Sequence, residues 1–569
     1  MSHFYQNSSS KMTNKEIARA FTDLAAIMEL HNENPYKIKS YQNAYITLRK
    51  LDTPLETMPR AEMDAVKGIG KSTGDKIVEL LTTGEISAFR QYADKTPAGV
   101  VDMLHIKGFG PKKIQAVWKE LEIESVGELL YACNENRLIE LHGFGQKTQE
   151  EIRKNTEYYL KSRNKVHWAI ADDMTEGVIK YLNSKFKEFK ISNAVIERVG
   201  EVRRLMPVVE KIELLVAGVD NMAQVFDNQK LVLLKENDHS YFAKTEDNFP
   251  VIIYTCAKDE LGSKMFKYSG SRSFLDSFVK NTEGVDFRHL PTEQAVFNKA
   301  NLPFIPAELR ENENILDVAK NNKLPELITL GDIKGVIHTH TTWSDGLHST
   351  KEMAEKAQQL GYQYIGISDH SKAAFYANGL KEDRVLAQWQ EIDQLNAGFF
   401  NFKILKSIES DILNDGSLDY SDDILRGFDF VIASVHSNLK MAEEKATARL
   451  IKAIENPFTT ILGHPTGRLL LSREGYPIDH KKVIDACAAN KVAIELNANP
   501  YRLDMDWSWI PYAREQGVLI SINPDAHSTT GISDIRYGIM AARKGGLDTE
   551  GCLNALDLEG FYDFICQKK

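Results

Sequence analysis

The feature that most constrains the fold is a repeated alternation of short apolar runs and longer helical segments in the part of the chain after residue 333. Seven runs rich in β-branched residues have about the length of a strand, and each ends at a polar residue. They span residues 336–340, 364–370, 402–409, 428–436, 460–464, 492–497 and 518–527. Segments with helical periodicity lie between them, at residues 350–360, 382–395, 445–454, 480–490 and 509–516. This alternation predicts a parallel sheet, and seven units favour its closure into a barrel.

In such barrels the chemistry collects at the carboxyl ends of the strands. Here those ends, together with the loop after the first strand, supply nine side chains that can bind a metal: His338, His340, Asp345, His370, Glu409, His436, His464, Asp525 and His527. Six of the 15 histidines of the chain fall at these positions, which random placement would rarely produce. The plainer interpretation is a set of scattered polar residues that cap strands. Converging imidazole and carboxylate groups have few structural uses, so the pattern favours a metal centre.

The ligand chemistry indicates which ions would bind. Imidazole nitrogens mixed with carboxylates, without a thiolate, suit zinc, manganese or iron better than magnesium or calcium. Nine ligands exceed the needs of one ion, so we expect two or three divalent ions, with Glu409 or an aspartate as a bridge. Clustered ions activate water and neutralise charge on a phosphate, which makes phosphoester hydrolysis the leading chemistry. Asp345, Glu409 and Asp525 are the candidate catalytic carboxylates.

These motifs resemble the PHP (polymerase and histidinol phosphatase) family of phosphoesterases. The resemblance is carried by His338-x-His340, Asp369-His370, Glu409, Ala433-Ser434-Val435-His436, Gly463-His464-Pro465 and Asp525-Ala526-His527, and it covers residues 333–569. It implies a distorted seven-stranded β/α barrel with a trinuclear metal centre. The family pattern would place His338, His340, Glu409 and Asp525 on one ion, Glu409, His436 and His464 on a second, and Asp345, His370 and His527 on a third. Arg468 is either a contact for the substrate phosphate or an exposed structural arginine.

The N-terminal part contains three similar cassettes, each an apolar residue and a Gly-apolar-Gly turn followed by a helix with an early lysine. The glycine pairs are Gly68 and Gly70, Gly108 and Gly110, and Gly143 and Gly145. Such a turn exposes backbone N–H groups that can hold a phosphate, although one copy alone is equally typical of a plain helix–helix turn. Three copies resemble helix-hairpin-helix modules, which bind the nucleic-acid backbone without reading its sequence. The net charge of −10 excludes a generally basic surface, so DNA contact must be local.

Residues 13–315 resemble the body of family X DNA polymerases, and the added PHP domain is similar to the bacterial members of that family. The resemblance rests on strands predicted at Val199-Gly200-Glu201-Val202-Arg203-Arg204, Lys211-Ile212-Glu213-Leu214-Leu215-Val216 and residues 250–254, and on Tyr268-Ser269-Gly270-Ser271-Arg272. Family members carry Gly-Ser at the start of the palm and three metal-binding aspartates. This chain has Glu201 in place of that serine, and Lys211, Glu213 and Ile252 in place of the aspartates. Two-metal nucleotidyl transfer needs acidic ligands, so the polymerase site is expected to be degenerate.

The chain is therefore expected to be multidomain. The segments are a disordered tail (1–12), an all-α N-terminal domain with the first helix-hairpin-helix (13–92), a fingers-like helical region with the other two (93–165), an α+β palm and thumb (166–315), a linker (316–332) and the α/β PHP barrel (333–569). Five cysteines without a CxxC pair fit a reducing compartment. The absence of a long apolar run or a signal-like N-terminus excludes a membrane and predicts a cytoplasmic protein.

We expect a metal-dependent phosphoesterase on a polymerase-like body that no longer polymerises. The front half would bind gapped or nicked DNA and present a 3′ end to the barrel, which would act as a 3′–5′ exonuclease in DNA repair of the base-excision type, with cutting at abasic sites as a further option. The alternatives are a phosphatase for a histidinol-phosphate-like small molecule, an active gap-filling polymerase with an unusual metal site, and a non-catalytic scaffold that binds DNA ends. The sequence names no protein partner.

Overall fold

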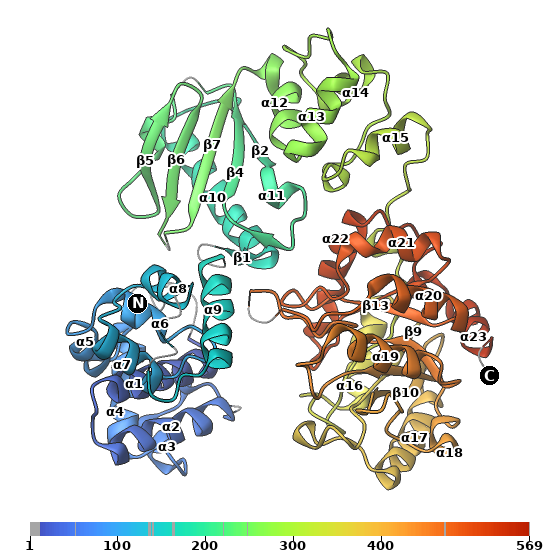
Figure 1. Cartoon of the computed structure of the whole chain (residues 1–569). Helices are drawn as coiled ribbons and strands as arrows, with labels where there is room; N and C mark the ends of the chain where they lie inside the picture. Colours follow the sequence, from blue (N-terminus) through green and yellow to red (C-terminus); the bar gives the residue numbers. More distant parts are fainter. Residues whose placement is uncertain are drawn as a thin grey trace. The chain divides into compact units, whose positions relative to one another are not determined.

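The computed structural model describes residues 12–51, 53–134, 138, 141–161, 165–219, 221–246, 248–471 and 474–567. The chain divides into two compact units, Met1–Arg163 and Asn164–Lys569 (Figure 1). The predicted disordered tail, residues 1–12, lies outside the described residues except for Met12. No helix in the described part of the chain combines the length and the apolar character that crossing a membrane requires.

The first unit is entirely helical where it is described. Its helices are α1 (Asn14–Leu30), α2 (Pro35–Arg49), α3 (Arg60–Ala65), α4 (Lys71–Thr83), α5 (Ser87–Ala93), α6 (Ala98–Met103), α7 (Pro111–Leu121), α8 (Val126–Asn134) and α9 (Gln146–Lys161). Thr13 and Glu16 form a capping box that starts α1, and the apolar face of α1 is buried against α2 and α4. The predicted cassettes are the turns before α4, α7 and α9. Gly68, Gly108 and Gly143 have positive φ there, a conformation that L-residues adopt only with strain.

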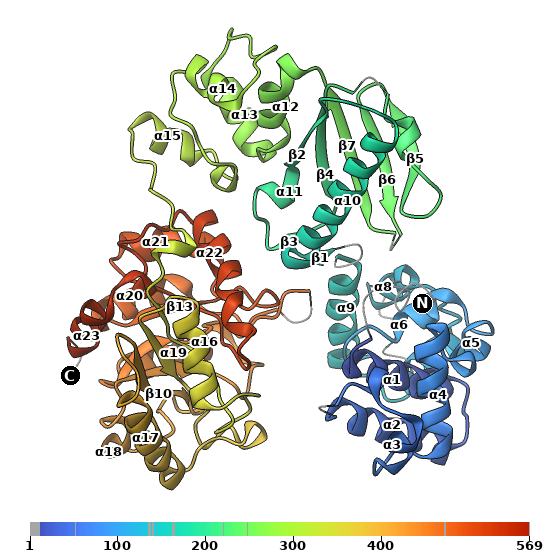
Figure 2. The same ribbon diagram turned by 180° about the vertical axis from the view of Figure 1, so that it is seen from behind.

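The second unit begins with a five-stranded sheet in the order β2-β4-β7-β6-β5, the palm-like part of the chain. Its elements are β1 (Val166–His167), α10 (Trp168–Glu188), β2 (Val195–Val199), α11 (Gly200–Arg203), β3 (Val208–Val209), β4 (Ile212–Ala217), β5 (Leu231–Asn237), β6 (Ser240–Thr245) and β7 (Pro250–Cys256). Figure 2 shows α10 lying across one face of this sheet, where Leu214 and Val216 are buried against it. The intervening residues of β4 face the other side, beneath the helix that follows β7.

One predicted strand of this region is wrong. Residues 199–204 are not a strand, because Val199 ends β2 and Gly200 begins the short helix α11. Gly200 has φ +66°, which breaks the extended conformation, and a Cβ at this position would lie 2.1 Å from Glu213 Oε2. The glycine is thus required both by its backbone angle and by the close approach of the neighbouring strand.

The thumb-like helices follow the sheet. They are α12 (Leu261–Tyr268), α13 (Arg272–Asn281), α14 (Glu293–Lys299) and α15 (Asn314–Lys320). They enclose an aromatic core that includes Phe266, Phe278 and Phe297. Within the expected linker, residues 316–332, Leu316 and Ala319 on α15 belong to this core, and Ile328 belongs to the core of the barrel.

The C-terminal part confirms the predicted α/β barrel class. Seven parallel strands lie in the order β14-β13-β12-β11-β10-β9-β8. They are β8 (Gly335–Val336), β9 (Tyr364–Ile367), β10 (Lys403–Asp411), β11 (Phe430–Ser434), β12 (Thr459–Leu462), β13 (Ala493–Asn497) and β14 (Ile520–Asn523). A parallel bridge between Thr339 and Ala526 joins the two edge segments, so the barrel is nearly closed. Most strands are shorter than the apolar runs, since their polar ends already belong to loops.

Helices cover the outside of this barrel. They are α16 (Thr350–Gln359), α17 (Glu382–Asn396), α18 (Asp422–Leu425), α19 (Glu443–Ile454), α20 (His480–Asn490), α21 (Ile510–Glu515), α22 (Ile535–Lys544) and α23 (Leu558–Cys566). All strand residues of β9, β11, β12, β13 and β14 are buried. Burial on both faces explains why these strands read as continuous apolar runs without alternation. It also means that a charged residue within such a strand must have a partner.

Candidate metal centre

The structure brings all nine predicted ligands together at the carboxyl end of the barrel strands. His338 and His340 follow β8, and His370, His436 and His464 follow β9, β11 and β12. Glu409 lies near the end of β10, Asp525 and His527 follow β14, and Asp345 lies in the loop after His340. They meet because parallel strands end at the same edge of a sheet.

Glu409 occupies the middle of the cluster. Its side chain is 1% exposed, and its two oxygens lie within 3.7 Å of five imidazole nitrogens. The shortest of these contacts join Oε1 to His464 Nε2 at 2.9 Å and Oε2 to His370 Nδ1 at 2.9 Å. A carboxylate with both oxygens among imidazoles from several strands can bridge two ions.

Three groups of side chains have ligand atoms close enough to hold one ion each. They are His340, Asp345, His370 and His527; His338, His340 and Asp525; and His370, Glu409 and His436. The first contains the predicted Asp345, His370 and His527 set, and the second contains most of the predicted first set. The geometry differs from the expected grouping in that His340 and His370 each belong to two groups. His464 joins none of the three, although it contacts Glu409.

Several buried nitrogen and oxygen atoms in the cluster lack a hydrogen-bond partner, and these atoms could bind an ion. His338 Nε2, both ring nitrogens of His340 and Glu409 Oε2 are buried and have no hydrogen-bond partner among the described residues. Buried polar atoms are nearly always paired, and leaving several unpaired in one place costs free energy. The donor set of imidazoles and carboxylates therefore fits divalent ions.

The carboxylates and histidines of the cluster shift one another's pKa values. Burial would lower the pKa of His338, but the carboxylate charges around it, with Glu495 first, raise that pKa well above its usual range. His340 is different, since burial and the positive charge of neighbouring histidines lower its pKa to about 4. Burial would raise the pKa of Glu409 and of Asp525, yet the histidines around them hold both pKa values well below their usual range. Glu409 and Asp525 are thus ionised at neutral pH, which is the form that binds a metal ion.

Two further carboxylates orient the ligand histidines, and the sequence interpretation missed both. Glu495, fully buried on β13, accepts a hydrogen bond from His338 Nδ1 at 2.7 Å. Asp411, at the end of β10, accepts one from His436 Nδ1 at 2.6 Å. In each pair the bonded Nδ1 leaves Nε2 to face Glu409, which is the arrangement that orients a metal ligand. The available signal was an acidic residue within a buried strand, as in Ala493–Asn497.

A buried aspartate holds the loop that carries Asp345. Asp369, which directly precedes His370, accepts hydrogen bonds from the backbone and hydroxyl groups of Thr341 and Ser344 and from Gln388 Nε2. Five donors on one fully buried carboxylate fix this loop in place. The position of Asp345, which is 35% exposed, therefore depends on Asp369.

Arg468, for which a phosphate contact or a structural role was expected, is engaged within the protein. Its Nη1 donates to Asp506 at 2.7 Å, its Nε donates to the carbonyl of Arg502 at 3.1 Å, and its Nη2 donates to the carbonyl of Leu503. All three guanidinium nitrogens are therefore used within the protein. These contacts hold the loop after β13, which favours the structural role for Arg468.

The polymerase-like site of the palm has a different chemistry. Glu213 on β4 is 7% exposed, and its Oε1 accepts a hydrogen bond from Tyr254 at 2.9 Å and lies 3.2 Å from Lys211 Nζ. Ile252 on β7 lies opposite Glu213 in the parallel register. Tyr254 stacks on Tyr268 with ring centroids 3.8 Å apart. The remaining acidic side chain is thus paired and enclosed, and none of the three metal-ligand groups among the described residues lies in the palm.

Four of the six predicted DNA-binding glycines have open space where a Cβ would stand, whereas a Cβ at Gly68 would lie 2.5 Å from Thr47 Oγ1. Gly70 and Gly110 are the N-caps of α4 and α7, with φ of −79° and −73° that any residue adopts. A Cβ added at Gly70, Gly110, Gly143 or Gly145 would meet no atom within 4 Å. Neither the backbone angle nor the packing of the described residues therefore explains the glycine at the two N-caps. Open backbone N–H groups at a helix N-terminus are suited to a phosphate.

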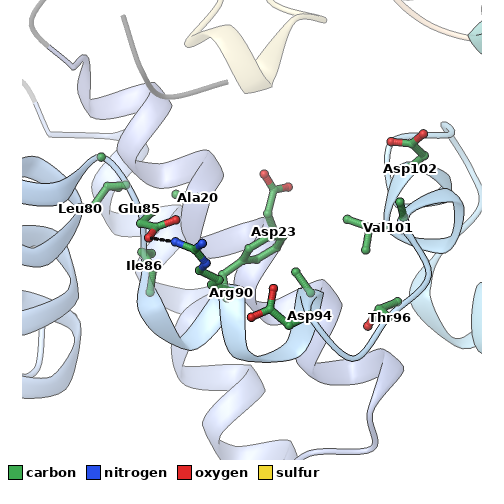
Figure 3. Close-up of a pocket in the computed structure, with 14 residues that line it drawn as sticks. Ala20, Asp23, Leu80, Glu85, Ile86, Arg90, Asp94, Thr96, Val101 and Asp102 are labelled. Atoms are coloured by element: carbon green, nitrogen blue, oxygen red, sulfur yellow. Dashed lines mark hydrogen bonds and ion pairs between the residues drawn. The ribbon is translucent and has the colours of Figure 1, made fainter. Parts of the chain in front are cut away.

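A cavity of about 320 Å³ lies in the N-terminal unit, apart from these features (Figure 3). It combines apolar side chains with the aspartates Asp23, Asp94 and Asp102, and its one labelled arginine, Arg90, is paired with Glu85 at 2.8 Å. None of the metal-ligand groups found among the described residues lies there. Among the described residues, the three groups that could hold a metal ion all lie at the mouth of the barrel.

Known proteins match both the helical and the barrel parts. A helix-hairpin-helix domain family matches residues 12–86, a SAM-like helix-hairpin-helix tandem matches residues 100–154, and the PHP domain family matches residues 337–499. The chain is 35% identical to the "DNA polymerase/3′-5′ exonuclease PolX" of Bacillus subtilis (strain 168), over 97% of this chain and 99% of that protein. A probable phosphatase of Thermoanaerobacter sp. (strain X514) is 29% identical over 41% of this chain and 94% of its own length. A probable phosphatase of Acetivibrio thermocellus is likewise 29% identical, over 41% of this chain and 95% of its own length.

Proposed function

Since the chain belongs to the bacterial family X DNA polymerases that carry a C-terminal PHP domain, we propose that it is a DNA-binding, metal-dependent phosphodiesterase that acts as a 3′–5′ exonuclease and no longer polymerises. Its helix-hairpin-helix domains indicate that it binds DNA. The substrate we propose is a gapped, nicked or 3′-ended DNA, in the context of repair, with abasic-site cutting as a further activity. The cytoplasm is the location that suits this substrate.

The observation that carries this proposal is the contrast between the two candidate metal sites of one chain. The barrel brings nine candidate ligand side chains together, Glu409 among them, and several of their buried nitrogen and oxygen atoms have no hydrogen-bond partner among the described residues. The palm has Lys211 and Ile252 where two acidic ligands would be needed, and its Glu213 is engaged by Tyr254. Two-metal nucleotidyl transfer requires carboxylates that hold both ions, which Glu213 alone does not provide.

The barrel residues would divide the work as follows. Two or three divalent ions of manganese, zinc or iron, when bound, would activate a water molecule and neutralise charge on the phosphate. His338, His340, Asp345, His370, Glu409, His436, His464, Asp525 and His527 would hold these ions. Glu495 and Asp411 keep the Nε2 atoms of two histidines pointing inward. Asp369 fixes the loop of Asp345 at the entrance.

The N-terminal hairpins would supply binding energy that is separate from the chemistry. The turns before α4, α7 and α9 offer backbone N–H groups to phosphates, and this binding carries no sequence information. The mode of binding accounts for a protein with a net charge of −10 that still engages DNA, because the contacts are local. Exonuclease action needs no base recognition, so the two halves suit one another.

The test is a denaturing gel of a 5′-labelled primer–template and of a one-nucleotide gap, with Mn²⁺ and with or without dNTPs. We expect stepwise shortening that is indifferent to dNTPs. His340→Ala or Asp525→Ala should lower the rate by more than about 100-fold, since even changes behind the ligands of a metal site cost 10- to 100-fold. The matched control is His239→Ala, an exposed histidine in the turn between β5 and β6. Primer extension would refute the loss of polymerase activity, and activity that survives in both variants would refute the barrel as the nuclease.

A second candidate is phosphatase action on a small monoester, favoured by the two probable phosphatases that match the barrel. These relatives lack a counterpart to more than half of this chain, because they cover only 41% of it. The two functions separate by substrate. Release of inorganic phosphate from a histidinol-phosphate-like monoester, with no shortening of DNA, would favour the phosphatase.

A further inference from the structure

The loop between β13 and α21 places an arginine, Arg502, inside the metal centre. Its Nη1 donates to Asp525 Oδ2 at 3.0 Å. The side chain of Arg502 is 16% exposed and that of Asp525 is 10% exposed, so this pair lies within the site and not at its rim. The other oxygen of Asp525 lies 3.0 Å from His340 Nε2, in the ligand cluster. One carboxylate therefore separates the guanidinium from the position of an ion.

Most donors of this guanidinium are not used by the protein. Among the described residues, Asp525 is its single hydrogen-bond partner, and its Nε is buried without one. The other internal arginines of the barrel are different: Arg449 donates to three backbone carbonyls, and Arg468 donates from all three nitrogens. Those two arginines hold the structure together. In Arg502, by contrast, Nη2 donates to no described residue and is not buried, so it is available to a ligand.

One unfilled donor of Arg502 can reach an anion. Nη1 contacts Asp525, and Nε is buried, so Nη2 is the nitrogen that remains for a ligand. Its N–H can donate to one oxygen of a phosphate, and the guanidinium charge strengthens that bond. The surrounding loop is held rigidly, since Arg468 binds the carbonyls of Arg502 and Leu503 and the amide of Arg502 donates to Asn499.

Positioning of Asp525 does not by itself explain the arginine. Asn497 Nδ2 already donates to Asp525 Oδ2 at 3.1 Å. Asp525 is also held by its own backbone, which has φ +51° and turns the side chain toward His338 and His340. Asp525 therefore has an orienting donor besides the arginine, and Arg502 pairs with it through Nη1 alone, which leaves Nη2 for a further negative ligand.

We propose that Arg502 binds a non-bridging oxygen of the substrate phosphate through its Nη2, beside the ions held by the cluster. This inference rests on the proposed phosphoesterase function and names a further substrate-binding residue of that site. The ligand chemistry is that of a phosphate mono- or diester, which a DNA backbone or free phosphate supplies. Arg502 would neutralise charge on the phosphate while Asp525 keeps the guanidinium in place.

The experiment measures the binding of inorganic phosphate to the full-length, Mn²⁺-loaded protein by titration calorimetry. The variants are Arg502→Met, Arg502→Lys and a control, Arg536→Met, which changes an exposed arginine on α22. Bound manganese is counted in each protein, and circular dichroism checks the fold. We expect Arg502→Met to weaken phosphate binding at least about tenfold with unchanged manganese content, Arg502→Lys to weaken it less, and Arg536→Met to match the unaltered protein.

Two results would overturn the proposal. One is phosphate affinity in Arg502→Met within about twofold of the unaltered protein, and the other is a loss of manganese in both Arg502 variants, which would make Arg502 a positioning residue for Asp525. Shortening of a 5′-labelled oligonucleotide is measured in parallel. If the unaltered protein leaves DNA intact but binds phosphate through Arg502, the exonuclease proposal fails and this one stands. If the unaltered protein and Arg502→Met shorten DNA equally well, the exonuclease proposal stands and the proposal for Arg502 fails.

Discussion

Glu495→Gln tests whether a carboxylate behind a ligand histidine determines metal affinity. Glu495 Oε2 accepts hydrogen bonds from His338 Nδ1 at 2.7 Å and from Asn523 at 2.9 Å. Its Oε1 accepts from the backbone N–H of His464 and from Asn497. Both oxygens thus face donors only, and the side chain is fully buried, so water does not replace a lost bond. In the variant, the nitrogen of the new side-chain amide would oppose a donor whichever way the amide turns.

His338 can relieve this conflict in only one way that keeps the bond. If the amide nitrogen faces His338, then Nδ1 must become the acceptor, and the ring proton moves to Nε2. Nε2 is the atom that faces Glu409 and Asp525, and a protonated Nε2 does not bind a metal. If the amide turns the other way, the backbone N–H of His464, another ligand, loses its acceptor. Either outcome disturbs a ligand of the cluster.

The expected loss of Mn²⁺ affinity is about 10- to 100-fold, or about 1.4–2.8 kcal/mol. The assay is competition between the folded protein and a chelating indicator, at fixed pH, with total manganese measured. The control is Glu355→Gln, the same chemical change at an exposed position on α16. Manganese affinity of Glu495→Gln within about twofold of the unaltered protein, with the fold intact, would refute the reasoning that Glu495 sets the tautomer of His338.

Gly70→Ala combined with Gly110→Ala should lower DNA affinity by about tenfold, because each methyl group stands where a phosphate would approach the open N–H groups. The free energy of unfolding should stay the same or rise by up to about 1 kcal/mol. Gly177→Ala, where a Cβ also meets nothing within 4 Å, is the matched control, and equal DNA binding by both proteins would contradict the hairpin contacts. Burial lowers the pKa of Lys544 to about 8, against 10.5 in the unfolded chain, despite its contact with Glu311. Between these two pH values the unfolded state binds more protons than the folded state, so the free energy of unfolding increases as the pH rises through this window. Urea unfolding at about pH 7.5 and about pH 10 should show this gain relative to Lys544→Met, and an equal difference at both pH values would contradict it. Chelation of metal should lower the unfolding temperature of the protein and abolish DNA shortening, but DNA should still bind through the hairpins. If DNA binding disappeared with the metal, the main DNA contacts would lie at the barrel.

The local pattern of the sequence was sufficient for the barrel and for the convergence of the candidate ligands at its carboxyl end. Each run that became β9 to β14 is apolar on both faces, which is typical of a strand covered by helices, and each reaches a polar residue at its end. Parallel strands present their carboxyl ends at one edge, so His370, His436 and His464 had to converge once the fold class was known. The same holds for the three glycine turns, because Gly68, Gly108 and Gly143 each need a positive φ.

The contacts between side chains from distant strands were decided only by the tertiary structure. Glu495 meets His338 across 157 positions of sequence, and no periodicity predicts that pairing. Arg468 is the arginine that the sequence singles out, yet it turns to Asp506 and the loop carbonyls, while Arg502, which no motif marks, turns to Asp525. Periodicity determines the face and the end of a strand at which a side chain lies. Which partner it meets there depends on register, loop path and rotamer, which only the packed chain settles.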